Sequence, residues 1–264
     1  MNQELIDALS ALAIHVQAWL AASGAVFARI GPFFALLPAF GERVVPARMR
    51  LVAALSMTAV VAPAVVARVP APTPEPIPVA LFLASETLVG LTLAIGLRLM
   101  VMVLQIAGTM AAQATSLSQA FGGAGVDPQP AISQILVMAG FAALVAAGFP
   151  ERLATLLVLS YDLFPAGDWP APAALAEWGA ARVSHAFSLA FSLAAPFVIG
   201  AGLYNLALGA INKAMPQLMV AFVGAPALTF GGLALLLITA PLMIGLWLGV
   251  VGDMLADPIG TGAP

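Results

Sequence analysis

The stretch of residues 204–226, YNLALGAINKAMPQLMVAFVGAP, separates two long apolar runs of this sequence. It contains Lys213, the only lysine of the chain, directly after Asn212 and shortly before Pro216 and Gln217. A cation at the centre of a membrane helix costs about 2.5–3.5 kcal/mol on insertion scales. At a tight turn between two helices, its ammonium group can instead reach water or a partner's carboxylate. The sequence therefore predicts a helical hairpin with Lys213 at its polar tip.

The composition is that of an integral membrane protein. Of 264 residues, 62% are hydrophobic and only 8% are charged, whereas soluble domains carry roughly 25% charged residues. The net charge of −3 includes no basic cluster, which argues against nucleic-acid binding. The lack of cysteine excludes disulfides, thiolate catalysis and cysteine-based metal sites. The first residues lack the basic region and cleavage site of a signal peptide, so we expect the first apolar run to stay in the mature protein.

The apolar runs predict an all-α membrane protein, because backbone polar groups in lipid must be satisfied inside helices. They cover residues 8–40, 51–67, 79–112, 131–164, 183–211 and 218–252, and one of the breaks between them is the Pro/Ala-rich stretch 165–182. The run 131–164 is notched at residues 148–152. Several runs exceed the ~20 residues of one upright span, which predicts long, kinked helices arranged as hairpins. We expect one helical domain, residues 1–264.

Two of these runs carry a stripe of small and polar residues at helical spacing. Small residues let helix backbones approach closely, and buried amides hydrogen-bond across such contacts. Both stripes are therefore predicted helix–helix contacts, either within this chain or with other subunits. The first stripe includes Glu86, Gly90 and Arg98, and the second includes Asn205, Gly209 and Asn212.

Glu86 and Arg98 are ionisable residues inside an apolar run. They are separated by ~18 Å along one helix, at 1.5 Å per residue, so they cannot pair with each other. Each needs a partner from another helix or chain, and such charges mark either a structural ion pair or a transport pathway. The second possibility makes the chain a subunit of a secondary transporter with Glu86 and Arg98 as pathway residues. The internal inverted repeats expected of such transporters are not evident.

No catalytic, cofactor-binding or metal site is predicted. The two histidines, His15 and His185, lie on different apolar runs without the HExxH spacing of a zinc site. The sequence has no GxSxG motif, P-loop or paired intramembrane aspartates. A membrane-bound enzyme would need such a catalytic constellation, so we expect the protein not to be an enzyme.

The stretch SLSQAFGGAGVDPQPAISQ, residues 116–134, is the main interruption between the central apolar runs. Its glycines permit backbone shapes that other residues resist, and its prolines stop a helix. It is either an ordinary surface loop or, if it lies at membrane depth and lines a cavity, a pore constriction or plug. The candidate plug residues are Phe121, Gly122, Gly123, Gly125, Asp127 and Pro128.

Two blocks of sequence resemble the FliR-type family of type III export-gate proteins, which occur in flagella and injectisomes. Residues 29–50, RIGPFFALLPAFGERVVPARMR, are similar to its first block, in which an arginine precedes Pro-aromatic, Pro-x-Phe-Gly and Val-Pro pairs. Residues 206–226 are similar to its second block, an Asn-basic pair followed by Pro-Gln and Gly-x-Pro. The order and spacing of the blocks extend the resemblance over essentially the whole chain. Its candidate contact residues in the first block are Arg29, Pro38, Phe40 and Gly41.

The resemblance implies a non-catalytic subunit of the export gate in the bacterial inner membrane, at the flagellar basal body. One copy would assemble with five copies of a partner P and four of a partner Q, surrounded by membrane lipid. An FlhB-like switch protein would contact the gate from the cytoplasmic side. Unfolded rod, hook and filament proteins would pass through, and residues 121–128 would form the plug. The resemblance implies no cofactor and no nucleic acid.

Overall fold

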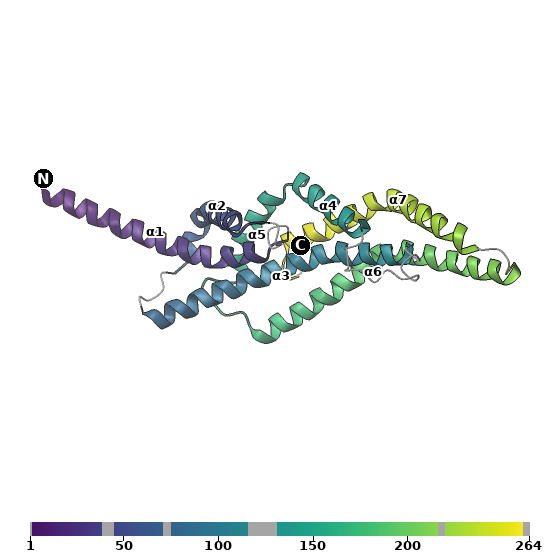
Figure 1. Ribbon diagram of the computed structural model, residues 1–264. Coiled ribbons are helices and arrows are strands. Elements are labelled where there is room, and N and C mark those ends of the chain that lie inside the picture. Colours follow the sequence, from purple (N-terminus) through teal and green to yellow (C-terminus); the bar gives the residue numbers. More distant parts are fainter. Residues whose placement is uncertain (1, 39–44, 71–74, 116–130, 216–219, 261–264) are drawn as a thin grey trace. The chain divides into compact units, whose positions relative to one another are not determined.

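The computed structural model describes residues 2–38, 45–70, 75–115, 131–215 and 220–260 (Figure 1). Across these ranges the secondary structure is helical and no strand occurs, which confirms the predicted all-α class. The elements are α1 (Asn2–Leu36), α2 (Ala47–Val65), the 3-10 turn η1 (Val66–Arg68), α3 (Pro76–Thr115), α4 (Ala131–Ala146), α5 (Phe149–Leu163), α6 (Pro172–Ala214) and α7 (Val220–Ala256).

Most of these helices are long and apolar enough to cross a membrane. Within the described ranges, α1, α2 with η1, α3, α6 and α7 each qualify by length and composition. The shorter α4 and α5 qualify only together, as one interrupted span. Together with the composition, these helices make the chain an all-α membrane protein.

The interruption between α4 and α5 is the notch expected at residues 148–152. Gly148 adopts a left-handed backbone with φ 76° at the N-terminal end of α5, a conformation that glycine tolerates best. Pro150 follows in the first turn of α5, where its missing N–H costs nothing because that group has no helical partner.

The predicted break at residues 165–182 is too long. Helix α6 begins at Pro172, and the backbone N–H of Leu175 already donates to the carbonyl of Ala171 at 3.0 Å. Proline is favoured at the first position of a helix, and the following AALAEWGAA is rich in helix-forming alanine. The connection between α5 and α6 is therefore residues 164–171.

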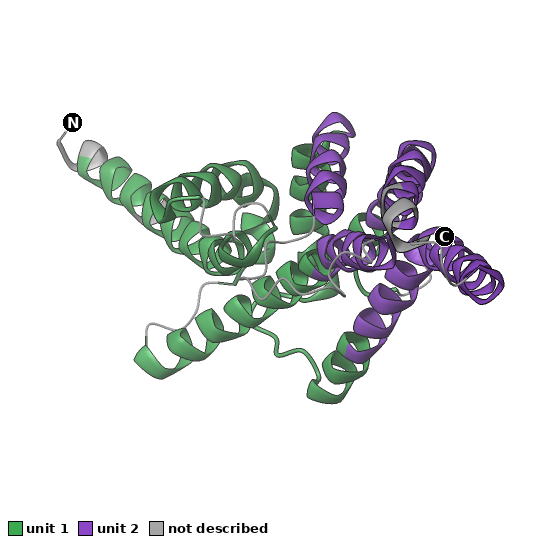
Figure 2. Ribbon diagram, turned by 45° about the vertical axis from the view of Figure 1, so that its right-hand side comes forward, with its two compact units in different colours: residues 1–98, 148–179, 254–264 green, residues 99–147, 180–253 purple. Residues whose placement is uncertain are grey.

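The chain clusters into two compact units (Figure 2). Unit 1 comprises residues 1–98, 148–179 and 254–264, and unit 2 comprises residues 99–147 and 180–253. Helices α3, α6 and α7 contribute residues to both units. The expectation of one domain over residues 1–264 stays a prediction.

Unit 1 is organised around the second half of α1. This helix packs on α2, and α2 packs on α5. Val26, Ile30 and Phe33 of α1 have no solvent exposure. Their spacing of three and four residues is that of one buried helix face, which places Arg29 beside the core.

Unit 2 contains close contacts between the second half of α3 and α4. Gly108 lies against the backbone of Ser133, whose nitrogen would be 2.9 Å from a Cβ at residue 108. The hydroxyl of Ser133 donates to the carbonyl of Gln105 at 3.1 Å. Farther along, the fully buried Trp247 of α7 donates its indole N–H to the carbonyl of Met100 at 2.7 Å. These contacts hold α4 and α7 against α3.

The α6 and α7 helices form a hairpin within unit 2 (Figure 1). The hydroxyl of Tyr204 donates to the carbonyl of Gly224 at 2.7 Å, and a Cβ at residue 224 would lie 3.2 Å from Leu208. Lys213 is exposed in the last turn of α6, which agrees with a position at the hairpin tip.

Candidate functional site

The most highly organised polar cluster of unit 1 is built on Arg29 of α1 and Glu86 of α3. Their side chains are 0% and 1% exposed, which is unusual for charged residues. Nε of Arg29 lies 2.8 Å from Oε2 of Glu86, and Nη2 lies 3.0 Å from Oε1. The pair is therefore bidentate, which is the strongest and most directional form of an arginine–carboxylate contact.

The remaining N–H groups of Arg29 bind the end of α5. Nη1 donates to the carbonyl and to the hydroxyl of Ser160, both at 3.0 Å. Nη2 also donates to the carbonyl of Phe164 at 3.0 Å. The carbonyls at the C-terminal end of a helix carry partial negative charge. The guanidinium thus satisfies all five of its donors and joins α1, α3 and α5.

Glu86 extends the cluster to the connection between α5 and α6. Its Oε1 accepts a hydrogen bond from the backbone N–H of Gly167 at 2.9 Å. Gly167 has φ 86°, and a Cβ there would come within 2.7 Å of the Phe82 ring. Only glycine fits both the backbone conformation and the space. The carboxylate therefore fixes the path of residues 164–171.

Tyr161 closes the cluster on the side of α5. Cζ of Arg29 lies 3.7 Å from the centre of the Tyr161 ring, a cation–π contact. The hydroxyl of Tyr161 is buried and makes no hydrogen bond to any residue that the structure describes. The tyrosine contributes its aromatic face to the arginine.

The cluster has the properties of a structural centre. A buried pair stabilises weakly, because desolvating both charges offsets most of their attraction, but removing one partner leaves an uncompensated charge. Both oxygens of Glu86 and every N–H of Arg29 are already bonded within the chain. Neither side chain offers a free polar group to a passing ion.

Only part of the predicted set meets at this centre. Arg29, Glu86 and Gly90 come together, since Gly90 packs against the backbone of Arg29. Arg98 is exposed on α3 and forms no ion pair within the described ranges. Pro38 follows the end of α1, and the second-stripe residues Asn205, Gly209 and Asn212 are exposed, like Lys213. The candidate contacts Phe40, Gly41, Pro216 and Gln217, and the candidate plug residues Phe121, Gly122, Gly123, Gly125, Asp127 and Pro128, lie outside the described residues.

Sequence reasoning missed the partners that α5 supplies. Ser160 and Tyr161 are adjacent polar residues near the end of an apolar run. Their position in that run is the one feature of the sequence that indicates a polar contact there. The backbone contributions of Phe164 and Gly167 leave no such signal in side-chain chemistry. Within the described residues, no group of three or more His, Cys, Asp and Glu side chains is arranged to hold a metal ion.

The sequence pattern of a known family, "Bacterial export proteins, family 1", matches residues 20–254. The chain belongs to this family of bacterial export proteins. The match includes the blocks at 29–50 and 206–226, and it confirms the FliR-type resemblance. The buried ion pair therefore lies in the membrane-type helices of an export protein.

Three relatives of this export protein are each named flagellar biosynthetic protein FliR. The one from Caulobacter vibrioides is 30% identical over 241 residues, covering 90% of this chain and 95% of the relative. The one from Bacillus subtilis is 30% identical over 214 residues, covering 76% and 79%. The one from Aquifex aeolicus is 26% identical over 223 residues, covering 81% and 83%. The similarity extends over nearly the full length of the first relative.

Proposed function

We propose that this chain is a non-catalytic subunit of the flagellar type III protein export gate. It would occupy the inner membrane at the basal body, as one copy with about five P and four Q subunits and an FlhB-like switch protein. Unfolded rod, hook and filament proteins would pass through this assembly. The observation that carries the proposal is the family match over residues 20–254, together with relatives named for flagellar biosynthesis.

The buried cluster supports a scaffold role over a transport site. A pathway carboxylate must exchange partners with its cargo, but both oxygens of Glu86 are bonded by Arg29 and Gly167. Arg98, the other candidate pathway residue, is exposed. These positions favour the export gate over a secondary transporter with Glu86 and Arg98 in its pathway.

The exposed stripe on α6 supports assembly with other subunits. A Cβ added at Gly202 or Gly209 would meet no atom within 4 Å, apart from the backbone of its own helix. Neighbouring apolar side chains, Leu203 and Leu206, are 65% and 73% exposed. Small residues flanked by exposed apolar ones suit a close contact with another apolar helix.

The decisive experiment is the native mass of the affinity-purified chain in mild detergent, from cells that express the complete export apparatus. We expect one copy of this chain in a large hetero-oligomer of about ten subunits. A free monomer or homodimer would contradict the gate and favour the transporter. A strain that lacks the chain should also fail to export hook and filament protein, and export should return with the wild-type gene.

A further inference from the structure

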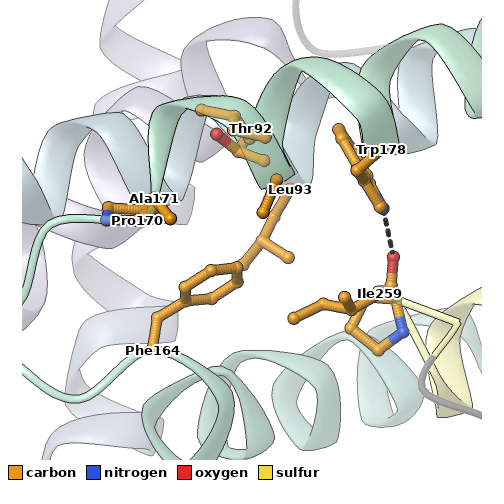
Figure 3. A pocket seen from close by; sticks show the side chains of 10 residues that line it. Thr92, Leu93, Phe164, Pro170, Ala171, Trp178 and Ile259 are labelled. Carbon is orange, nitrogen blue, oxygen red and sulfur yellow. Dashed lines mark hydrogen bonds between the residues drawn. The ribbon is translucent and has the colours of Figure 1, made fainter.

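Unit 1 contains an apolar pocket of about 220 Å³, which neither Arg29 nor Glu86 lines (Figure 3). Leu93 of α3 and Phe164 of the connection form one part of its wall. Leu175 and Trp178 of α6 form another, and Ile259 closes it after the end of α7. Three segments that are distant in sequence, on α3, on the α5–α6 connection with the start of α6, and after α7, thus line one apolar space.

The polar side-chain atoms in the wall are already hydrogen-bonded. The hydroxyl of Thr92 donates to the carbonyl of Leu88 at 2.8 Å. The indole N–H of Trp178 donates to the carbonyl of Pro258 at 2.9 Å, the bond drawn in Figure 3. A buried water needs two to four polar partners, and these side chains offer none. The pocket therefore suits an apolar occupant.

The ion-pair cluster holds one wall of the pocket in place. The carbonyl of Phe164 accepts from Arg29, and its side chain lines the cavity. Glu86 binds Gly167, three residues before the lining residue Pro170. On the opposite side, the Trp178 ring packs against Gly96, where a Cβ would lie only 3.3 Å from the indole. Because its walls are fixed on both sides, the pocket does not collapse when empty and is preorganised to bind a ligand.

We propose that this pocket binds part of a phospholipid acyl chain. Its walls include α3 and α6, two helices that are by length and composition apolar enough to cross a membrane, so a lipid acyl chain suits their apolar surface. Elsewhere on α3, the apolar side chains Leu81 and Ile95 are 53% and 46% exposed. An engineered apolar cavity of about 150 Å³ binds benzene, and a flexible acyl chain can follow a larger, irregular space.

The connection also carries a residue suited to the bilayer boundary. Trp169 is 55% exposed and directly precedes the lining residue Pro170. Tryptophan is enriched where acyl chains meet headgroups. A lipid could therefore place its headgroup near Trp169 while its acyl chain enters beside Phe164. A protein side chain is the less favoured occupant, because the side chains of the wall offer no free hydrogen bond or charge to orient a peptide.

Quenching of Trp178 by brominated lipid tests the proposal directly. In a Trp19→Phe, Trp169→Phe background, Trp178 reports on the pocket, while Trp247 is fully buried and adds a constant signal. Phosphatidylethanolamine–phosphatidylglycerol vesicles with brominated acyl chains should quench Trp178. Adding Ala174→Leu, which fills the pocket, should remove at least about half of this quenching.

The matched control is Ala173→Leu, an exposed neighbour that does not line the pocket. It should leave the quenching unchanged, and equal gel-filtration profiles would show that both variants fold. Native mass spectra should retain a phospholipid on the wild type and on Ala173→Leu, and lose it on Ala174→Leu. Equal quenching in both leucine variants would overturn the proposal. Loss of quenching when partner subunits are bound would overturn it too, since a partner side chain would then be the occupant. Neither result would bear on the export-gate assignment.

Discussion

Gly90 of α3 lies directly against the backbone carbonyl of Arg29 on α1, one helical turn after Glu86. A Cβ at residue 90 would collide with the carbonyl oxygen and would be 2.9 Å from the carbonyl carbon. This close approach brings the two helices near enough for Arg29 and Glu86 to form a bidentate pair. Gly90 and Glu86 of the predicted stripe therefore both belong to the contact between α3 and α1.

We expect Gly90→Ala to separate α1 from α3, because the collision involves backbone that cannot rotate away. Overpacking of this kind costs about 1–3 kcal/mol or more, and here it also strains the ion pair. The measurement is the thermal midpoint in detergent and the amount of protein in membranes. The control is Gly24→Ala on α1, where nothing lies within 4 Å, and which should be neutral or slightly stabilising. Equal behaviour of the two variants would contradict the contact.

Glu86→Gln should destabilise the protein by about 3–5 kcal/mol, because it leaves the buried charge of Arg29 uncompensated. Arg29→Lys should behave similarly, since an ammonium group cannot reproduce the guanidinium's five directed bonds. The double variant Arg29→Met, Glu86→Leu should lose less than the sum of the corresponding single changes. A double-mutant cycle of unfolding free energies measures this coupling, and strict additivity would show that the pair does not act as a unit.

The exposed ion pair Arg68–Asp162 serves as a comparison for the buried pair Arg29–Glu86. Nη1 of Arg68 lies 2.9 Å from Oδ1 of Asp162, with side chains 46% and 55% exposed. Breaking such a pair typically costs only about 0–1 kcal/mol. We expect Arg68→Ala to leave the midpoint nearly unchanged under conditions in which Glu86→Gln shifts it strongly.

In unit 2, Trp247→Phe should remove the indole N–H that now donates to the carbonyl of Met100. The Met100 carbonyl keeps its partner within α3, so the loss is that of one hydrogen bond, about 0.5–1.5 kcal/mol, and the smaller ring adds a cavity. Thermal unfolding measures the loss. Trp19→Phe is the control, because Trp19 is 45% exposed and should tolerate the change. An unaltered midpoint for Trp247→Phe would show that this hydrogen bond contributes little.

The helices could be predicted from the sequence because one strong constraint sets them. Apolar runs in a membrane protein must be helical, so the runs at 79–112 and 218–252 anticipate α3 and α7 closely. The predicted start of α6, at residue 183, was too late, because the prolines at 165–172 were read as breaking the helix. In a helix's first turn, as at Pro172, proline is instead a favourable start.

The ion pair could be anticipated only in part. The position of Glu86 in an apolar run shows that it needs a partner, and its 12-residue distance from Arg98 excludes that pair. Nothing in the sequence pattern shows that α1 approaches α3 at Gly90, so Arg29 could not be chosen as the partner. Long-range contacts of this kind depend on how the helices pack, which hydrophobic periodicity leaves open.

Shortening residues 121–130 should make the assembled gate leak small ions, if this segment is the plug proposed from the family resemblance. The physical reason is that a constriction seals only while its residues fill the pore. Ion conductance of membranes containing the assembled gate measures the leak, with a variant that keeps the length but replaces Pro130 by alanine as the control. Unchanged conductance in the shortened variant would refute the plug.

Gly209→Leu should separate assembly from folding. A side chain at residue 209 meets nothing within 4 Å in this chain, so the variant should accumulate and melt like the wild type. If the α6 stripe contacts another subunit, the added side chain blocks the close approach of the two helices. We expect about a tenfold lower yield of co-purified partners, equivalent to about 1.4 kcal/mol. Ala207→Leu, exposed on the same helix but off the stripe, should co-purify normally. Normal co-purification of Gly209→Leu would place the subunit contact elsewhere on the chain.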